Sequence, residues 1–240
     1  HRLLEMVPGE TLMRRSDKQL ECDLLVCDEA SMLDLQLALA LVRALSPGTT
    51  LVFVGDVDQL PSVGPGRVLA DLIDSGVVMF TRLREIFRQA EGSGIIENAH
   101  RILAGQLPIS AARGTELADF YWIEAAEAVT ARDLVVRLLT ERIPQRFSLD
   151  PLTDIQVLTP MHRGEVGTEE LNRALQLALN PVVQQVTAQG VGNLPVLKSR
   201  GRLLAVGDKV MQIRNDYERD VWNGDVGLVS GVDLEEGALT

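Results

Sequence analysis

The amino-acid sequence predicts an α/β fold built on buried parallel strands. Two stretches, residues 24–31 and 51–61, each begin with a short apolar run and end abruptly in acidic residues. This pattern is typical of a buried parallel strand whose carboxyl end opens onto a ligand site. Apolar segments of strand length also alternate with segments of helix length, which favours parallel strands joined by right-handed crossovers. In open α/β sheets, ligands bind beyond the carboxyl ends of the strands.

The size and composition of the chain are those of a folded protein. With 240 residues, of which 46% are hydrophobic, it can form one large or two modest domains. No apolar run approaches the roughly 20 residues needed to span a bilayer, and the first residues resemble no signal or transit peptide. Cys22 and Cys27 flank one predicted strand and are too close to build a disulfide framework. They indicate reduced thiols in a cytoplasmic protein. Because no apolar run is long enough to span a bilayer, we expect no membrane partner.

The charge of the chain does not decide whether it binds nucleic acid. A net charge of −11 argues mildly against binding, because nucleic-acid-binding proteins are more often basic. Net charge is a global sum, however, and a groove needs only a local basic stripe. The basic residues are nearly all arginine, since Lys18, Lys198 and Lys209 are the only lysines. Arginine suits phosphate recognition, but a genome rich in arginine codons would give the same composition.

Residues 1–108 form the first predicted domain. After the strand that starts at Leu24, Ser31 with Asp34 three residues later resembles the cap of a helix N-terminus. The run 33–45 alternates superficially like a strand, but it is too long and too rich in leucine and alanine, so we predict a buried helix. The later predicted elements are a strand over 50–54, a helix through 68–73 that ends at Gly76, a strand over 77–80 and a helix from 94 to Gly105.

A second predicted domain covers residues 109–190. Composition changes around residues 107–115, where proline, glycine and other small residues collect, and we place the domain boundary there. The predicted elements beyond it are a helix over 126–143 that is stopped by Pro144, a strand over 155–158 and a helix over 168–179.

The third predicted domain, 191–240, differs in character from the first two. Glycines recur, and the segments 209–213 and 226–229 have the composition of short antiparallel strands. Between them, Asn223 and Gly224 form a dipeptide that is typical of hairpin turns. We therefore predict that a small β-barrel begins in this part of the chain.

The two acidic strand ends carry the residue types that nucleotide hydrolysis needs. Asp28 follows its apolar run as a Walker B aspartate does, where it can hold a magnesium ion while Glu29 orients water. Taken alone, this pair would also suit the start of a solvated loop. The second stretch adds Gly55, which allows close backbone approach, Asp56, which can hydrogen-bond the site, and the neutral Gln59, which can contact phosphate and attacking water. Together the two stretches predict hydrolysis of a nucleotide.

Six segments of the chain carry a resemblance to a known family. They are residues 28–31, 55–61, 83–89, 159–164, 207–215 and 222–227. In this order they resemble successive motifs of the superfamily 1 helicases, closest to the RecD-like DNA helicases, which include the exodeoxyribonuclease V alpha subunit. The resemblance implies partial RecA-like P-loop NTPase sheets in 1–108 and 109–190, and the start of an SH3-like β-barrel insert in 191–240.

Two motifs of that family are absent from the sequence. It contains no Gly-x-x-x-x-Gly-Lys-Ser/Thr phosphate loop, and the last motif, which supplies a second phosphate-contacting arginine, is also missing. We therefore expect an internal fragment of a longer helicase. Because hydrolysis requires parts from both RecA-like domains, we expect the fragment to be inactive as an ATP hydrolase by itself.

The resemblance also implies roles for single residues at the nucleotide. Asp28 would hold Mg²⁺ through water, Glu29 would orient the attacking water and Gln59 would sense the γ-phosphate of ATP. Arg88 would stabilise the charge on the transferred phosphoryl group, although it would also suit a surface ion pair with Glu85 or Glu91. The implied nucleotide-binding residues are therefore Asp28, Gly55, Asp56, Gln59 and Arg88.

Further positions are implied for contact with DNA. The residues that the resemblance places there are Pro61, His162, Arg163, Asn215 and Asn223. Polar side chains and backbone amides can hold phosphates without reading sequence. His162 would also suit an ordinary surface position, and Asn223 an ordinary turn. Tyr217 and Trp222 could stack on bases, but we expect them to fill the core of the small barrel instead.

The activity implied for the parent protein is ATP-dependent translocation on single-stranded DNA and unwinding at duplex junctions, with 5′ to 3′ polarity. ATP and Mg²⁺ are the implied cofactors, and other recombination or repair subunits are candidate partners. Two alternatives remain open. One is a catalytically inactive RecA-like binding or scaffold module. The other is a different superfamily 1 enzyme, such as a conjugative relaxase-helicase or an RNA helicase.

Overall fold

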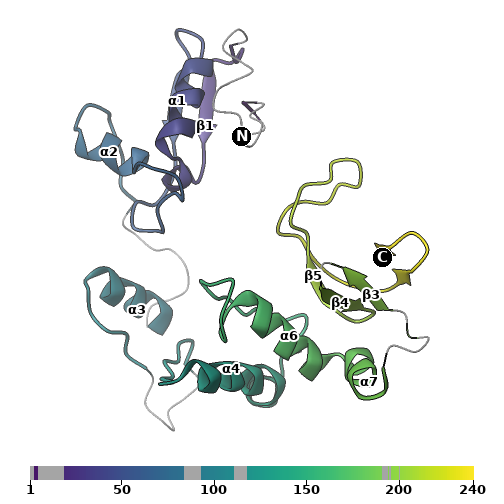
Figure 1. Cartoon of the computed structure of the whole chain (residues 1–240). Coiled ribbons are helices and arrows are strands. Elements are labelled where there is room, and N and C mark those ends of the chain that lie inside the picture. The colour runs from purple at the N-terminus through teal and green to yellow at the C-terminus, as the bar shows by residue number, and fades with distance from the viewer. Residues whose placement is uncertain are drawn as a thin grey trace. The chain divides into compact units, whose positions relative to one another are not determined.

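The computed structural model describes residues 3–4, 19–83, 93–110, 118–190, 194, 196–199 and 201–240. The chain divides into two compact units, His1–Trp122 and Ile123–Thr240. Figure 1 labels many of their helices and strands. None of the helices in the described residues is long and apolar enough to cross a membrane.

The first unit is built around a parallel pair of strands, as the sequence predicts. β1 (Leu24–Cys27) lies beside β2 (Thr50–Phe53), with Cys27 opposite Phe53. The helix between them, α1 (Leu35–Ala44), lies along β1 in Figure 1. Every second strand residue packs against the buried side of α1, and these are Leu25, Cys27, Leu51 and Phe53. Because the strands are parallel, their carboxyl ends lie at the same edge of the sheet.

The start of α1 differs from the prediction. Asp34 itself is the N-terminal cap: its backbone is extended, and its Oδ1 accepts a hydrogen bond from the Leu37 backbone N–H at 2.7 Å. Ser31 lies earlier, in the 3-10 turn η1 (Ala30–Met32). Its Oγ is buried and has no hydrogen-bond partner among the described residues. The predicted cap at Ser31 is therefore wrong, because the short turn η1 separates the strand from the helix.

The predicted strand over 77–80 is wrong. The preceding helix, α2 (Val68–Asp74), forms and packs its buried Leu69 against Ala30 and Leu33. After it, Val77 is 85% exposed and Met79 is fully exposed, and no described strand pairs with this segment. A strand exists only where a neighbour accepts its backbone hydrogen bonds, and the composition of one segment does not show whether that neighbour is there.

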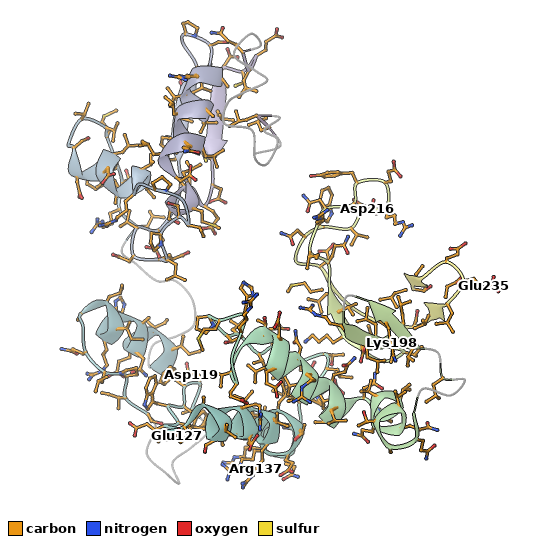
Figure 2. All side chains as sticks on the ribbon, viewed as in Figure 1. Asp119, Glu127, Arg137, Lys198, Asp216 and Glu235 are labelled. Atoms are coloured by element: carbon orange, nitrogen blue, oxygen red, sulfur yellow. The ribbon has the colours of Figure 1, made fainter. Side chains whose placement is uncertain are left out.

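The last helix of the first unit is α3 (Gly94–Leu103), and it ends as predicted at Gly105, which has φ 71°. Asp119, labelled in Figure 2, lies after α3 in the sequence and contacts the start of this helix. Its carboxylate accepts hydrogen bonds from the Ser93 hydroxyl and the Gly94 backbone N–H. The Ser93 hydrogen bond lowers the pKa of Asp119. The buried Asn98 exchanges hydrogen bonds with both backbone groups of Ile109, at 2.9 and 2.6 Å.

The second unit begins with one long helical stretch. It comprises α4 (Ala128–Arg137), a π-helical turn η2 (Leu138–Arg142) and α5 (Ile143–Phe147). Glu127 and Arg137, labelled in Figure 2, mark the two ends of α4. The prediction that Pro144 stops the helix is wrong, because this proline lies in the first turn of α5, where its missing N–H is not needed. The π turn just before it resets the hydrogen-bonding pattern.

The predicted strand over 155–158 is also wrong, because no described strand pairs with it. Instead, the Lys209 ammonium donates a hydrogen bond of 2.9 Å to the Ile155 carbonyl. An aspartate turn precedes the segment: Asp150 Oδ1 accepts from the backbone N–H groups of Leu152 and Thr153, both at 2.8 Å. These bonds lower the pKa of the Asp150 carboxyl.

Two further helices meet at a buried polar cluster. α6 (Thr168–Leu179) has the predicted bounds, and α7 (Pro181–Gln189) follows after Asn180. Asp208 is only 6% exposed. Its carboxylate accepts hydrogen bonds from the side-chain amides of Asn180 and Gln176 and from the Ala205 backbone N–H, at 2.6 to 2.8 Å. Since a buried carboxylate must be fully hydrogen-bonded to be tolerated, this cluster ties both helices to the strands that follow.

The remaining strands form antiparallel pairs, as predicted for this region. They are β3 (Val196–Ser199) with β4 (Arg202–Ala205), β5 (Lys209–Met211) with β6 (Val226–Leu228), and β7 (Val232–Asp233) with β8 (Ala238–Leu239). The Asn223–Gly224 turn forms, with the Asp225 N–H donating to the Trp222 carbonyl at 3.0 Å. It does not join the strands directly, because residues 212–225 make one long loop between β5 and β6.

Candidate nucleotide and nucleic-acid sites

Asp28 and Glu29 lie directly after β1, and both are exposed. Asp28 Oδ1 accepts a hydrogen bond of 2.8 Å from the Glu29 backbone N–H. Glu29 has a left-handed backbone, with φ 51° and ψ 39°, which is uncommon for a residue other than glycine. The next residue, Ala30, donates its N–H to the Val54 carbonyl at 2.8 Å. The sharp turn after β1 is thereby tied to the end of β2.

Asp56 and Gln59 lie in the loop that follows the carboxyl end of β2, at the same edge of the sheet. Asp56 Oδ1 accepts from the Asp58 backbone N–H at 3.0 Å, and Gln59 Nε2 lies 3.4 Å from Asp56 Oδ2. The parallel register of β1 and β2 therefore brings Asp28, Asp56 and Gln59 to one edge of the sheet. Cys27 precedes this edge and is partly buried, which raises the pKa of its thiol.

Gly55 is required by contacts within the chain. A Cβ atom added there would lie 2.9 Å from the Leu69 side chain and 3.0 Å from the backbone nitrogens of Ala30 and Ser31. The close approach expected at this glycine is thus made by η1, and contact between Gly55 and a nucleotide stays a prediction. Arg88 falls in residues 84–92, outside the described residues, so its role also stays a prediction.

Pro61 is exposed and begins a turn that is held against the start of α1. Within the turn, the Ser62 hydroxyl donates to the carbonyls of Gly64 and Gly66, both at 3.0 Å. The Leu35 backbone N–H donates to the Pro65 carbonyl at 2.8 Å. The turn therefore presents Pro61 from an ordered position beside the sheet edge that carries Gln59.

The residues at this edge fit a magnesium ion that arrives with a nucleotide. The described part of the chain holds no group of three or more histidine, cysteine, aspartate or glutamate residues that could bind a metal ion. Mg²⁺, however, is commonly bound by one or two carboxylates together with water and substrate phosphates. Asp28 uses Oδ1 for the Glu29 N–H, and one exposed carboxylate of this kind is a suitable protein ligand for such an ion.

In the second unit, His162 and Arg163 lie in an exposed turn that is fixed to the start of α6. The Thr159 hydroxyl donates to the Val166 carbonyl at 2.6 Å, and the Thr168 N–H donates to the Met161 carbonyl at 2.9 Å. The His162 ring nitrogen Nδ1 lies 3.4 Å from the Thr168 hydroxyl. The two predicted contact residues are therefore presented by an ordered loop.

Asn215 and Asn223 are brought together in the loop between β5 and β6. The Asn223 backbone N–H donates to Asn215 Oδ1 at 2.7 Å, and Asn215 Nδ2 donates to the Tyr217 hydroxyl at 2.9 Å. The rings of Tyr217 and Trp222 pack edge to face with centroids 5.2 Å apart. Their side chains are 46% and 41% exposed, so the interpretation that they fill the barrel core is wrong. Figure 2 labels Asp216 on the same loop.

Sequence reasoning did not single out Asp208 or Arg132. Asp208 lies in the segment 207–215 that carries part of the family resemblance, but only the fold shows that it is buried among Gln176, Asn180 and Ala205. Arg132 contacts Glu165, which is 33 positions away. No local pattern links two residues so far apart in the sequence.

Two family models match the chain. The AAA domain matches residues 1–128, and the ATP-dependent RecD-like DNA helicase SH3 domain matches residues 171–240. Together they cover the parallel pair β1–β2 and all of the antiparallel strands.

Several known proteins are similar to the chain. The ATP-dependent RecD2 DNA helicase of Deinococcus radiodurans is 34% identical over 207 residues, which cover 86% of this chain and 25% of that protein. The RecBCD enzyme subunit RecD of Mycolicibacterium smegmatis is 32% identical over 240 residues, which cover 95% of this chain and 40% of that protein. The chain thus spans two fifths or less of the length of these curated relatives.

Among solved structures, the crystal structure of Bacteroides Pif1 bound to ssDNA is 18% identical, with 88% of this chain and 48% of that chain covered and a TM-score of 0.38. The family assignment rests on the sequence matches, which agree with the order of the motifs and with the parallel and antiparallel parts of the fold. An AAA domain followed by a RecD-like helicase SH3 domain shows that the chain belongs to the RecD-like superfamily 1 DNA helicases.

Proposed function

We propose that the protein couples ATP hydrolysis to movement along single-stranded DNA and to unwinding at duplex junctions. The observation that carries this proposal is the sheet edge in the first unit. There, the parallel register of β1 and β2 gathers Asp28, Glu29, Asp56 and Gln59 in a member of a DNA helicase family. Ligands of open α/β sheets bind at such an edge.

The proposed roles at the nucleotide follow from the chemistry of each group. Asp28 would hold Mg²⁺ through water, and the ion would supply positive charge that neutralises the phosphates of ATP. Glu29 accepts a hydrogen bond from the attacking water and so orients it. The Gln59 amide can donate to a phosphate oxygen and accept from water at once. Arg88 stabilises the charge that builds on the transferred phosphoryl group.

The proposed contacts with DNA come from the turn at Pro61 in the first unit and from two exposed loops in the second. His162 and Arg163 offer an imidazole and a guanidinium to phosphates, and Asn215 and Asn223 offer amides. The loop between β5 and β6 also carries the exposed Tyr217–Trp222 pair, and stacking on an unpaired base needs an exposed aromatic face of this kind.

The finer features of the proposal come from the family. Movement has 5′ to 3′ polarity, and other recombination or repair subunits are candidate partners because the relative from Mycolicibacterium smegmatis is named as a subunit of the RecBCD enzyme. The proposed location is the cytoplasm, and the proposed domains are 1–108, 109–190 and 191–240. RNA in place of DNA is the main alternative substrate, and a catalytically inactive binding module is the main alternative function.

The test is steady-state ATP hydrolysis by the complete gene product, with and without single-stranded DNA. We expect strong stimulation by DNA and less by an RNA of the same sequence. Glu29→Gln should leave ATP binding nearly intact and lower turnover by about two orders of magnitude or more, because orientation of the reacting water is lost. Glu21→Gln, an exposed glutamate before β1, is the matched control and should retain turnover.

Two results would contradict the proposal. Unchanged turnover in Glu29→Gln would remove the assigned role of this carboxylate. No hydrolysis by the complete gene product, under conditions where it binds single-stranded DNA, would favour the binding module. When single-stranded DNA is titrated into the complete gene product, Asn223→Ala should weaken DNA binding. An unchanged affinity would remove the loop between β5 and β6 from the proposed DNA site.

A further inference from the structure

Arg132 of α4 reaches across to the turn that carries His162 and Arg163. Its Nη1 lies 2.6 Å from Glu165 Oε2 and 3.3 Å from Glu170 Oε1. Nε and Nη2 contact Asp133 Oδ1 at 3.0 and 2.9 Å. The Arg132 side chain is 22% exposed, well below the exposure of an ordinary surface arginine on this helix such as Arg137, at 57%.

Three carboxylates and a second arginine complete this group. Glu170 also accepts two hydrogen bonds from Arg173, at 2.6 and 2.9 Å. The hydrogen bond that Arg132 donates to Asp133 and the charges of Asp133, Glu165 and Glu170 raise the pKa of Arg132, while the hydrogen bond from Arg173 lowers the pKa of Glu170. A planar guanidinium that contacts several carboxylates from fixed directions holds them more firmly than a single exposed ion pair.

Arg132 contacts the turn next to a glycine. Gly164, between Arg163 and Glu165, has φ 91°, a conformation that glycine adopts easily and can also leave easily. Hydrogen bonds join the two ends of the turn, at Thr159, Met161 and His162 on one side and Val166, Thr168 and Glu169 on the other. Within the turn, the Gly167 N–H donates to the Gly164 carbonyl at 2.9 Å. Glu165 lies between these ends, and its contact with Arg132 attaches that part of the turn to α4.

We propose that Arg132 is a positioning residue that, through Glu165, holds the turn of His162 and Arg163 in the orientation that contacts the DNA backbone. The proposal rests on the proposed function, since it assumes that the turn contacts DNA. Arg132 itself contacts neither DNA nor nucleotide. It sets the DNA concentration that is needed to stimulate ATP hydrolysis. When the contact between Arg132 and Glu165 is lost, the turn can still bind DNA. Binding then requires the turn to return to this orientation first.

The structure offers a matched control on the same helix. Arg137 lies five residues further along α4. Its Nε lies 3.9 Å from Glu141 Oε2, and both side chains are more than half exposed. Arg132→Ala and Arg137→Ala remove the same side chain from the same helix. Only Arg132→Ala removes a contact with the turn.

The experiment measures ATP hydrolysis by the complete gene product as single-stranded DNA is titrated. Arg132→Ala should raise the DNA concentration for half-maximal stimulation about tenfold, because a displaced contact group loses binding energy. Turnover at saturating DNA should stay within about twofold of that of the unsubstituted protein, since the residues proposed to bind the nucleotide are unchanged. Arg137→Ala should change neither quantity. Arg132→Glu combined with Glu165→Arg should restore much of the DNA affinity lost in Arg132→Glu alone.

The outcomes separate this inference from the proposed function. If His162→Ala and Arg163→Ala raise the half-maximal DNA concentration but Arg132→Ala does not, the positioning role is overturned and DNA contact by the turn stands. If none of the variants changes the DNA dependence while ATP hydrolysis remains DNA-stimulated, DNA contact by the turn is wrong. A loss of turnover and thermal stability in Arg132→Ala, at an unchanged half-maximal DNA concentration, would assign Arg132 a purely structural role. Arg132→Lys keeps the charge and supplies the same titration if Arg132→Ala does not fold.

Discussion

Glu29 shows how one residue can be strained where chemistry is expected. Its left-handed backbone, at φ 51°, is imposed by the turn that links the end of β1 to η1, and the Ala30 N–H bond to Val54 keeps that turn closed. A non-glycine residue in this conformation costs about 1 kcal/mol or more. Strain of this kind is tolerated where the position of a side chain matters more than stability.

This strain gives a prediction about stability. Both Glu29→Gly and Glu29→Ala remove the carboxylate, but only glycine adopts the left-handed conformation without strain. We expect Glu29→Gly to be more stable than Glu29→Ala by about 1 kcal/mol, the reverse of the usual order for these residues in a helix. Urea denaturation of the two variants measures the difference, and equal stability would show that the turn carries no strain.

At the scale of elements, the contacts between α4 and α6 depend on ionised carboxylates. The Arg173 hydrogen bond lowers the pKa of Glu170 in the folded chain, and Arg132 acts in the same direction. A glutamate whose pKa is lower in the folded state stabilises the fold above its ordinary pKa. That contribution is lost as the pH falls through the lowered value.

We therefore expect the thermal stability of the chain to fall on acidification partly through Glu170, with no such change between pH 6 and 8. Glu170→Gln removes the titrating group, so its melting temperature should depend less on pH in the acidic range. Circular dichroism at a series of pH values makes the comparison. Identical pH dependence in the parent and the variant would show that the network does not stabilise the packing of these helices.

At the scale of the whole molecule, the parallel sheet has one open face. Leu24, Val26, Val52 and Val54 are 40 to 55% exposed, and they alternate with the residues that pack on α1. Parallel sheets are normally covered on both faces, which is why their strands are apolar throughout. In the described residues, α1 and the cluster of Ala30, Leu33 and Leu69 pack against the other face of this pair of strands.

The open face should bind an apolar fluorescent dye in the purified 240-residue chain. Val26→Thr with Val52→Thr keeps the β-branched shape of these residues but makes the face polar, and we expect much weaker dye fluorescence with an unchanged far-ultraviolet spectrum. Val42→Thr changes an exposed valine on α1 and is the matched control. Dye fluorescence that is unaffected by the double variant would place the apolar surface elsewhere.

The sequence by itself determined the features that depend on neighbouring residues. The apolar runs and acidic ends of β1 and β2, the leucine- and alanine-rich composition of α1, and the periodic faces of α3 and α6 are local patterns. The structure has these elements within one or two residues of the predicted bounds. The motifs placed the chain in its family for the same reason. They are short segments whose order along the chain is visible without a fold.

Only the tertiary structure decided what depends on distant residues. The segments 77–80 and 155–158 have strand composition, but no strand in the described residues pairs with them. Asp208 is buried by helices about 30 positions away. Arg132 forms an ion pair with Glu165, which is 33 positions away in the sequence. Strand pairing, burial and ion pairs are set by which segments meet in space. A sequence records the local preferences of each segment, whereas the fold determines which of those preferences are satisfied together.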